Sequence, residues 1–323
     1  MIEPGRRATA PSGPSPDPIP RWALAACPGG VLAGARAPWG FTHETWILTP
    51  RTGPPIAVQR RRDRSDPTRP RARAIRAAVR ATGVPVPEPA RIDAGGRRPV
   101  LVLPFVPGVP AASMLGSDAV AEAAGSLCGR VAATLAGTSL AGLHLGGAWT
   151  SGRALRAAGR TWAGRCSGLL AERSLRALDA VLEQAATEAD AAPAAFAHGD
   201  LAPVNILVHA GRVAAVLDLD RARAAPPDYD AAWFLWVVGY HHPEVVAVAW
   251  AGYARGADLP PGLPPATAWL QPLQLLELAS SSRDTEERSR WAARLEALLG
   301  GRSPPKRIQS GRAGNPPCGR KTT

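Results

Sequence analysis

The sequence predicts an α+β protein with two lobes, a smaller N-terminal lobe built on strands and a larger, mainly helical C-terminal lobe. The chain has 323 residues, of which 46% are apolar, so it is long enough for two separate hydrophobic cores. Short apolar runs, among them Ile56–Val58 and Val100–Leu103, are typical of strands. From residue 120 onward, apolar residues recur at helical spacing instead.

Both ends of the chain differ in composition from the middle. Residues 1–22 and 301–323 are rich in proline, glycine, serine and basic residues and lack apolar periodicity, which predicts disordered tails. Between these tails we expect an N-terminal lobe over residues 23–106 and a helical lobe over residues 107–300.

A helix is expected after the strand at Ile56–Val58, because two sets of residues recur there at helical spacing. The apolar set is Ala72, Ile75 and Val79, and the basic set is Arg69, Arg73, Arg76 and Arg80. We interpret the apolar set as the buried face and the basic set as a solvent-exposed face. A surface for phosphate or nucleic acid is the alternative interpretation of the basic set.

The helical lobe begins with an alanine- and leucine-rich segment over residues 120–145. Leu127, Val131 and Leu135 are spaced four apart, which predicts one buried stripe. We interpret His144, near the end of this segment, as a buried and hydrogen-bonded core residue.

The most informative stretch of the chain covers residues 196–220. Asp200 and Asn205 stand five residues apart, and Asp218 follows at the end of an apolar run. A carboxylate such as Asp200 can orient a hydroxyl group and accept its proton. The oxygens of Asn205 and Asp218 are of the kind that Mg²⁺ prefers as ligands. This order and spacing are typical of a phosphotransferase active site.

A hairpin is predicted between the two metal-ligand candidates. Residues 206–208 and 213–217 are short apolar runs on either side of Ala210-Gly211-Arg212, a turn sequence. A chain that folds back at this turn brings Asn205 and Asp218 alongside each other, so that both can face one ion.

These motifs resemble those of the aminoglycoside phosphotransferase and choline kinase type of protein-kinase-like enzymes. In that family the catalytic loop has glycine in its middle position, where this chain has Gly199. Residues 225–232 resemble the segment that opens the next helix, in which the acidic residue that matches Asp230 holds the loop. Residues 83–87 and 100–108 resemble the family's connection from its first helix and its hinge strand.

The resemblance covers residues 25–240 and implies both a fold and an activity. The fold is the two-lobed protein-kinase-like fold, with a small antiparallel sheet in the N-terminal lobe. The lobe over residues 23–106 would bind the nucleotide, and the helical lobe over residues 107–300 would be the catalytic and substrate-binding lobe. The activity is transfer of the γ-phosphoryl group of ATP to a hydroxyl group of a small molecule. Asp200 would be the catalytic residue, and Asn205 and Asp218 would hold Mg²⁺.

The resemblance also implies which residues contact ATP. The glycine-containing hairpin around Gly40 and Thr42 would lay backbone N–H groups over the phosphates, and Phe105 lies in the hinge strand. The family places a cation at the strand end that here carries Gln59 and Arg60, so either residue is a candidate for the phosphate contact. Arginine would bind phosphate through two N–H groups, whereas glutamine would supply only a neutral dipole.

One residue that the family pattern predicts is missing. The family pairs the strand cation with a carboxylate on the following helix, near Ala72, where this chain has no acidic residue. An alternative hypothesis is therefore a pseudokinase, a nucleotide-binding regulatory protein without turnover. The complete set of Asp200, Asn205 and Asp218 favours the enzyme, because a protein without turnover has little chemical need for all three.

We predict that the acceptor is an aminoglycoside or another amine-bearing compound such as choline. The mildly acidic helical lobe can hold a cationic acceptor through carboxylates. Sugars, homoserine and fructosamines remain alternatives, because a fold does not choose among acceptors. The candidate carboxylates after the catalytic segment are Glu244, Asp258, Glu277, Asp284, Glu286 and Glu287.

The distribution of charge argues against nucleic acid as a partner. The chain carries +12 overall, but residues 60–98 carry +8, residues 302–323 carry +6 and residues 99–300 carry −4. A basic RNA-associated protein is a third interpretation, and it depends only on the tails and the basic set of the predicted helix.

The sequence also predicts a cytoplasmic location. It contains no run of 18 apolar residues, so we expect no membrane span. The apolar stretch at residues 22–35 is interrupted by Pro28-Gly29-Gly30, which makes a poor secretory signal. Four cysteines have neither the spacing of a zinc site nor the density of a disulfide scaffold, so free thiols are expected. The oligomeric state is not predicted.

Overall fold

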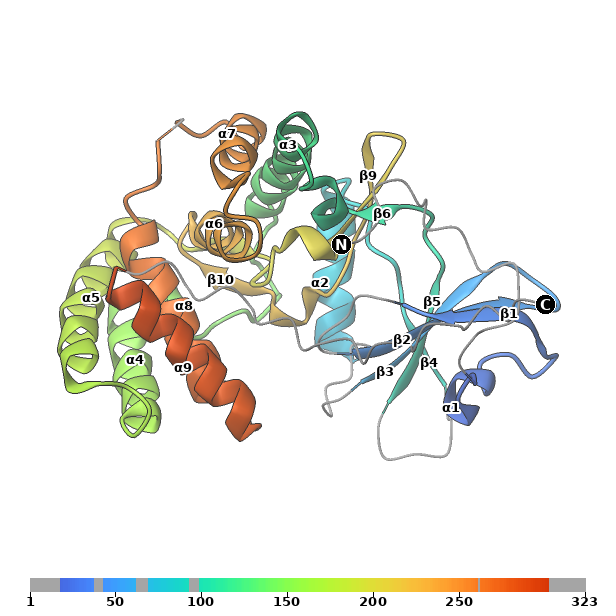
Figure 1. The fold of residues 1–323 in the computed structure, drawn as a ribbon, viewed down its shortest axis with the longest axis horizontal. Helices are drawn as coiled ribbons and strands as arrows, with labels where there is room; N and C mark the ends of the chain where they lie inside the picture. The colour runs from blue at the N-terminus through green and yellow to red at the C-terminus, as the bar shows by residue number, and fades with distance from the viewer. Residues whose placement is uncertain (1–17, 38–42, 62–68, 93–98, 261, 302–323) are drawn as a thin grey trace, which may run out of the picture.

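The structure, a computed structural model, describes residues 18–37, 43–61, 69–92, 99–260 and 262–301. Figure 1 shows two lobes, with an antiparallel sheet at one end of the molecule and a group of helices at the other. The α+β class and the division into a sheet lobe and a larger helical lobe are confirmed.

The N-terminal lobe is a five-stranded antiparallel sheet in the order β1-β2-β3-β5-β4. Its strands are β1 (Val31–Arg36), β2 (His43–Pro50), β3 (Ile56–Arg61), β4 (Ala90–Ile92) and β5 (Val100–Pro104). Side chains alternate between the two faces of a sheet, so Trp46, Leu48 and Val58 form a small core on one face. The short helix α1 (Arg21–Leu24) packs against this core through Ala23.

Residues near the N-terminus also belong to this core. Ile19 and Trp22 are partly buried and pack against it. The predicted tail over residues 1–22 is therefore wrong at its C-terminal end, because these two apolar side chains lose water-exposed surface to the sheet. Residues 1–17 and 302–323 lie outside the described residues.

Helix α2 (Pro70–Ala81) lies between the sheet and the helical lobe (Figure 1). Proline stands at its first position, where the missing N–H would have no helical partner. Ile75 and Val79 are buried, as the apolar periodicity predicts. The helix therefore turns its apolar face to the core of the C-terminal lobe, of which both residues are part.

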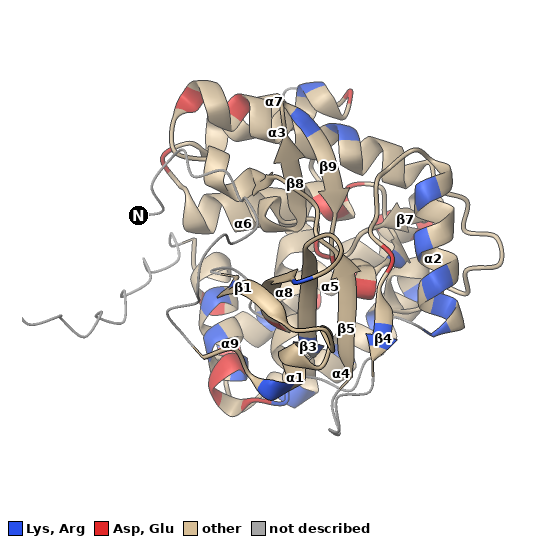
Figure 2. Cartoon of the chain, turned by 90° about the vertical axis from the view of Figure 1, so that its right-hand side faces the viewer, with Lys and Arg blue, Asp and Glu red and all other residues tan. Residues whose placement is uncertain are grey.

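The prediction that the whole basic set of α2 faces solvent is wrong for Arg76, which is 5% exposed. Its Nη2 lies 2.9 Å from Oε1 of Glu88, and Nη1 of Arg80 lies 2.6 Å from Oε2 of the same carboxylate. The carboxylate compensates the charge of Arg76, which a buried guanidinium requires. Figure 2 shows the basic residues along α2 in blue.

The C-terminal lobe is mainly helical. Its helices are α3 (Asp118–Ala136), α4 (Gly152–Cys166), α5 (Glu172–Ala191), α6 (Tyr229–His241), α7 (Val246–Gly256), α8 (Thr267–Ser281) and α9 (Thr285–Leu299). Two small sheets, with the orders β6-β8-β9 and β10-β7, complete the lobe. Their strands are β6 (Val109–Pro110), β7 (Ala195–Ala197), β8 (Ile206–His209), β9 (Arg212–Val216) and β10 (Arg223–Ala225). Single 3₁₀ turns are η1 (Ala111–Met114), η2 (Ala148–Thr150), η3 (Pro203–Asn205) and η4 (Leu219–Arg221).

Helix α3 ends at Ala136 rather than near residue 145, because glycine, threonine and serine follow and have low helix propensity. His144 lies beyond the helix end, is exposed and has a φ of 48°. The prediction that it is a buried core residue is therefore wrong. The predicted buried stripe of α3 is confirmed at Leu127, Val131 and Leu135.

Helices α3 and α7 meet backbone to backbone. A Cβ atom at Gly125 would lie 1.9 Å from the carbonyl oxygen of Ala249, and one at Gly252 would lie 2.0 Å from that of Glu122. Only glycine permits so close an approach. The core that the two helices build extends to Leu201, directly after the candidate catalytic residue.

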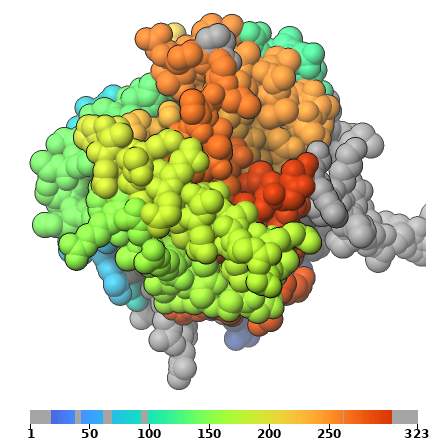
Figure 3. Space-filling view, turned by 90° about the vertical axis from the view of Figure 1, so that its left-hand side faces the viewer, coloured from blue at the N-terminus to red at the C-terminus, as the bar shows by residue number. Residues whose placement is uncertain are grey.

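A second core lies at the far end of the C-terminal lobe, among α4, α5, α8 and α9. Figure 3 shows the green to yellow surface of α4 and α5 across this end, with the red surface of α9 beside it. Helix α9 begins at an N-cap, because the Asp284 carboxylate accepts the N–H of Glu287 at 2.8 Å. Its Ala292 and Leu295 are buried in the second core.

None of the helices within the described ranges is long and apolar enough to cross a membrane. Cys27, Cys128 and Cys166 are buried and carry free thiols. Burial raises the pKa of the Cys128 thiol to about 12, so this side chain acts as a small core residue rather than a nucleophile.

Candidate active site

The backbone of the catalytic loop is held by one buried carboxylate. Asp230, at the start of α6, is 5% exposed, and its two oxygens accept the N–H groups of His198 at 2.7 Å and Gly199 at 3.0 Å. Burial raises the pKa of Asp230 above its ordinary value. The structure thus gives Asp230 the loop-holding role that the family resemblance implies.

Gly199 occupies a position that admits no side chain. Its φ is +82°, and a Cβ atom there would lie 2.1 Å from the carbonyl oxygen of Arg221. The close approach packs the catalytic loop against η4, which follows Asp218. The glycine therefore sets the distance between the catalytic loop and η4.

His198 uses its ring to connect the catalytic loop to the segment that leads to Asp218. The ring is fully buried, its Nδ1 accepts the N–H of Asp200 at 3.3 Å, and its Nε2 lies 2.9 Å from the carbonyl oxygen of Leu217. A ring whose Nδ1 accepts a hydrogen bond carries its proton on Nε2, which then donates to Leu217. His198 is thus a structural link between the catalytic loop and the residue that precedes Asp218.

Asp200 is partly buried and is oriented by a residue that sequence reasoning missed. Its Oδ1 accepts the indole N–H of Trp233 on α6 at 2.8 Å. Its carbonyl oxygen accepts the amide N–H of Asn205 at 2.9 Å, which turns the amide oxygen of Asn205 away from the loop backbone. No local signal in the sequence links Trp233 to Asp200, because 33 positions separate them.

The predicted hairpin is confirmed and brings Asn205 close to Asp218. Strands β8 and β9 pair with Ile206 opposite Val216, and the N–H of Leu217 donates to the carbonyl oxygen of Asn205 at 2.8 Å. The turn at its tip has positive φ at both central residues, Ala210 at 48° and Gly211 at 74°. Asp218 itself is left-handed, with a φ of 59°, where the strand gives way to η4.

Two further side chains join Asp218. Nε2 of His43, on β2 of the N-terminal lobe, lies 3.8 Å from Oδ2 of Asp218 and 4.0 Å from Oδ2 of Asp220. The possible donor atoms of these three residues all lie within 4.8 Å of one another. Carboxylate oxygens are ligands of the kind that Mg²⁺ prefers, so Asp218 and Asp220 fit that ion. Sequence reasoning missed His43 and Asp220 as members of this group.

Gln59 and Arg60, the two candidates for the phosphate contact, lie on opposite faces of the sheet, because neighbouring side chains of strand β3 alternate between its faces. Arg60 lies on the face covered by α1: its Nη2 is 2.7 Å from Oε2 of Glu44, and its Cζ is 4.8 Å from the ring centroid of Trp22. Gln59 lies on the other face, and its cross-strand partner on β5 is Leu101. The two candidates therefore do not share one site.

The remaining candidates for ATP contacts are placed only in part. Phe105 is partly buried directly after β5, and its N–H donates to the carbonyl oxygen of Pro55 at 3.2 Å. It lies in the connection that leads from the sheet lobe to β6. Gly40 and Thr42 lie outside the described residues. Helix α2 contains no acidic residue, so the carboxylate that the family pattern predicts near Ala72 is absent from it.

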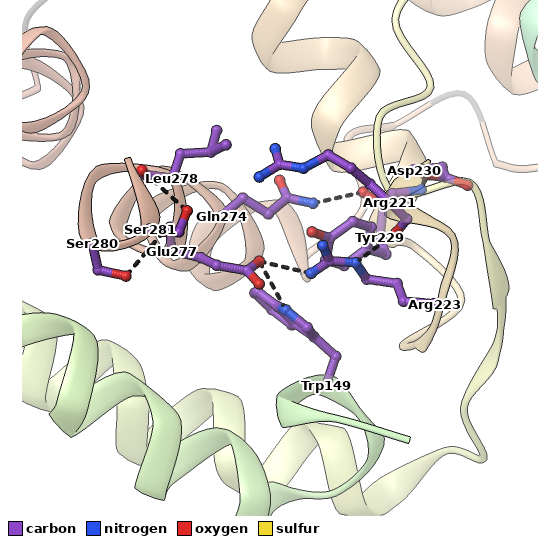
Figure 4. Close-up of polar contacts among 11 residues, drawn as sticks. Trp149, Arg221, Arg223, Tyr229, Asp230, Gln274, Glu277, Leu278, Ser280 and Ser281 are labelled. Atoms are coloured by element: carbon purple, nitrogen blue, oxygen red, sulfur yellow. Dashed lines mark hydrogen bonds and ion pairs between the residues drawn. The ribbon is translucent and has the colours of Figure 1, made fainter. Parts of the chain in front are cut away.

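Five of the six carboxylates predicted to bind an amine have structural partners, and the sixth, Asp258, is exposed. Figure 4 shows Glu277, whose Oε2 accepts Nη1 of Arg223 at 2.7 Å and the indole N–H of Trp149 at 3.1 Å. Among the described residues, no hydrogen bond or ion pair joins these carboxylates to the catalytic loop. The other partners are His242 for Glu244, the N-terminus of α9 for Asp284, Arg290 for Glu286 and Ser282 for Glu287.

A family model matches residues 34–273, and its description is the phosphotransferase enzyme family. The match spans the sheet lobe, the catalytic loop and the helices as far as α8. Among curated protein sequences, none is similar enough to this chain to count as a match.

Several solved phosphotransferases are similar in fold. A thermostable mutant of aminoglycoside phosphotransferase APH(4)-Ia in its apo form is 14% identical, with a TM-score of 0.64 over 88% of this chain and 99% of that chain. Macrolide 2′-phosphotransferase MphH from Brachybacterium faecium is 20% identical, with a TM-score of 0.52 over 85% and 93%. Amicoumacin kinase hAmiN in complex with AMP-PNP, Ca²⁺ and Ami is 12% identical, with a TM-score of 0.55 over 81% and 87%. The predicted protein-kinase-like fold is confirmed.

Proposed function

Since the chain belongs to the phosphotransferase enzyme family and is a small-molecule phosphotransferase, we propose that it transfers the γ-phosphoryl group of ATP to a hydroxyl group of its acceptor. The observation that carries this proposal is the placement of Asp200. Its backbone is held through Asn205, and its carboxylate is oriented by Trp233. The site thus presents one positioned carboxylate on a loop whose backbone is held by the buried Asp230.

We assign the proton transfer to Asp200. The acceptor hydroxyl donates its hydrogen bond to the carboxylate oxygen that Trp233 does not occupy, and the carboxylate takes the proton as the new O–P bond forms and the bond to ADP breaks. Trp233 keeps the carboxylate in one rotamer, so the hydroxyl meets it in a fixed direction. Orientation of this kind raises the rate by holding the reacting groups in place before the reaction.

We propose that Asn205 and Asp218 hold Mg²⁺, with Asp220 and His43 beside them. The ion, when bound, neutralises charge on the phosphates of ATP. The amide nitrogen of Asn205 is used by the loop backbone, so its oxygen is the ligand atom. The left-handed conformation of Asp218 places its carboxylate at the turn between β9 and η4, beside the end of the hairpin.

For ATP we propose contacts from Gly40, Thr42, Gln59 and Phe105, with the nucleotide between a lobe over residues 23–106 and a lobe over residues 107–300. Gln59 is preferred to Arg60, because Arg60 is already paired with Glu44 on the face covered by α1. Nucleotide binding is supported by a structural neighbour, a thermostable mutant of aminoglycoside phosphotransferase APH(4)-Ia, solved as a ternary complex with ADP and hygromycin B.

A second candidate is a pseudokinase, a nucleotide-binding regulatory protein without turnover. Two observations favour it: a neutral Gln59 on the face of β3 opposite α1, and a helix α2 without a carboxylate. The complete set of Asp200, Asn205 and Asp218 favours the enzyme. We also propose a cytoplasmic location and a small-molecule partner, with an aminoglycoside or another amine-bearing compound as the acceptor that the sequence predicts.

The proposal is tested by ADP release from Mg²⁺-ATP in the presence of aminoglycosides, other amine-bearing antibiotics, choline, homoserine and sugars. Asp200→Ala protein is the blank, because it retains the nucleotide residues. An acceptor that raises the rate above this blank supports the enzyme. ATP binding without a response to any acceptor would favour the pseudokinase, and no ATP binding at all would contradict both.

A further inference from the structure

A cavity of about 250 Å³ lies among α6, α8 and α9. None of its lining residues is among those so far assigned to ATP or the metal ion. Aromatic and aliphatic side chains form most of its wall. The residues that define its shape are Trp236 and Tyr240 on α6, Leu263 before α8, Gln271 on α8, and Arg294 and Leu298 on α9.

A row of stacked rings joins this cavity to the catalytic carboxylate. Trp233, which donates to Asp200, stacks on Trp236 with 5.2 Å between ring centroids and 19° between planes. Trp236 in turn stacks on Tyr240 at 5.2 Å and 18°. Trp233 and Tyr240 are seven residues apart on one helix, which corresponds to about 10 Å along its axis. A molecule that occupies the cavity and also contacts Asp200 must therefore be at least about that long.

The charge at the cavity is positive. Cζ of Arg294 lies 4.4 Å from the ring centroid of Tyr240, 4.5 Å from that of Trp291 and 5.7 Å from that of Trp236. Among the described residues that line the cavity there is no aspartate or glutamate. A ligand cation would thus be repelled by the guanidinium of Arg294, which the aromatic rings already hold. A neutral or anionic ring would stack on the wall without repulsion from a like charge.

We propose that this cavity binds the phosphoryl acceptor through an apolar ring system that is neutral or anionic, with the reacting hydroxyl extended toward Asp200. The proposal rests on the phosphotransferase function proposed above and narrows its acceptor. A compact polyamine such as an aminoglycoside would place its cations beside Arg294. An amine on the acceptor must therefore lie outside the cavity, and acceptors as short as choline or homoserine cannot span from the cavity to Asp200.

The first test measures binding of anilinonaphthalene sulfonate, a fluorescent aromatic anion, to the full chain. Arg294→Glu reverses the charge at the cavity, and Leu263→Glu adds a negative charge at a rim position that is 66% exposed and so tolerates substitution. Arg290→Glu is the matched control, since Arg290 is on the same helix and 58% exposed but does not line the cavity. We expect about tenfold weaker binding for the first two variants and less than about twofold for the control.

The second test measures turnover with two acceptor sets, hydroxylated compounds that carry an apolar ring system and aminoglycosides. We expect ADP release only with the first set, and we expect Arg294→Glu to raise the KM for the acceptor while kcat and the KM for ATP stay within about twofold. Asp200→Ala, by contrast, should lower kcat.

Three results would overturn the inference. The first is equal probe binding by the wild type and all three variants. The second is ADP release with aminoglycosides and an acceptor KM that Arg294→Glu leaves unchanged, in which case the phosphotransferase function stands. The third is tighter probe binding by a chain that ends at residue 301, which would assign the cavity to the chain's own C-terminal segment. If the protein binds ATP but releases ADP with none of the acceptors, the proposed phosphoryl transfer is contradicted. Binding of the probe then decides separately whether the cavity accepts an apolar anion.

Discussion

The indole N–H of Trp233 donates a 2.8 Å hydrogen bond to Oδ1 of Asp200, so the carboxylate at the centre of the site is oriented by helix α6. Asp230, in the first turn of the same helix, accepts two backbone N–H groups of the catalytic loop. The loop and its carboxylate are thus positioned by one rigid element.

Trp233→Phe should lower kcat about tenfold, because a hydrogen bond worth about 1.4 kcal/mol corresponds to that factor in rate. The KM for ATP should change little, since Trp233 lies in the helical lobe and the proposed nucleotide residues lie in the other. Trp250→Phe is the matched control: Trp250 is also buried and stacked, but its indole N–H has no hydrogen-bond partner among the described residues. Equal kcat values for the two variants in steady-state assays would contradict a positioning role for Trp233.

Gly199→Ala should destabilise the protein by several kcal/mol, more than the roughly 1–2 kcal/mol of left-handed strain alone. Its Cβ atom would collide with the carbonyl oxygen of Arg221 at 2.1 Å. Gly211→Ala separates the two effects, because Gly211 also has a positive φ, but a Cβ atom there would meet no described atom within 4 Å. Urea unfolding of both variants checks this, and equal losses would mean that the loop moves away from η4.

Asp230→Asn tests the buried carboxylate through its pH dependence. Burial raises the pKa of Asp230 above its unfolded value of about 3.9. The folded state therefore holds the proton more tightly, so the contribution of Asp230 to stability is largest below the unfolded pKa and is lost as pH rises through the folded pKa. The free energy of unfolding of the wild type, minus that of Asp230→Asn, should fall as pH rises from about 4. A difference that grows with pH would contradict the direction of this shift.

Glu277→Ala should destabilise the protein by about 3 kcal/mol, because it leaves Arg223 without its carboxylate in a largely buried position. The pair is 18% and 20% exposed, and Trp149 loses its acceptor as well. Glu183→Ala removes a comparable partner from Arg156, but this pair is 36% and 57% exposed, so a loss under about 1 kcal/mol is expected. Thermal or urea unfolding measures both, and equal losses would show that Glu277 has no special structural role.

The sequence predicts the parts of the site that are local in the chain. The order of Asp200, Asn205 and Asp218 and the hairpin at Ala210-Gly211 depend on spacing and turn chemistry, and the structure places them as a unit. The turn could be predicted because Gly211 adopts positive φ without strain and an apolar run lies on either side, although the positive φ of Ala210 is unfavourable for alanine.

The sequence does not predict contacts between distant elements. Trp233 reaches Asp200 only because α6 packs against the catalytic loop, and His43 reaches Asp218 from the other lobe. Helical periodicity also places Arg76 in solvent, since periodicity carries no information on Glu88, which compensates its charge. These misses share one cause: tertiary packing decides which side chains meet.

The decisive experiment for the proposed active site is phosphoryl transfer by Asp200→Ala, measured with the acceptor that the wild type uses. We expect a kcat about 10²–10⁴-fold lower, with the affinity for Mg²⁺-ATP retained, because general-base positioning is worth that much. An unchanged kcat would remove Asp200 from the reaction and with it the proposed active site.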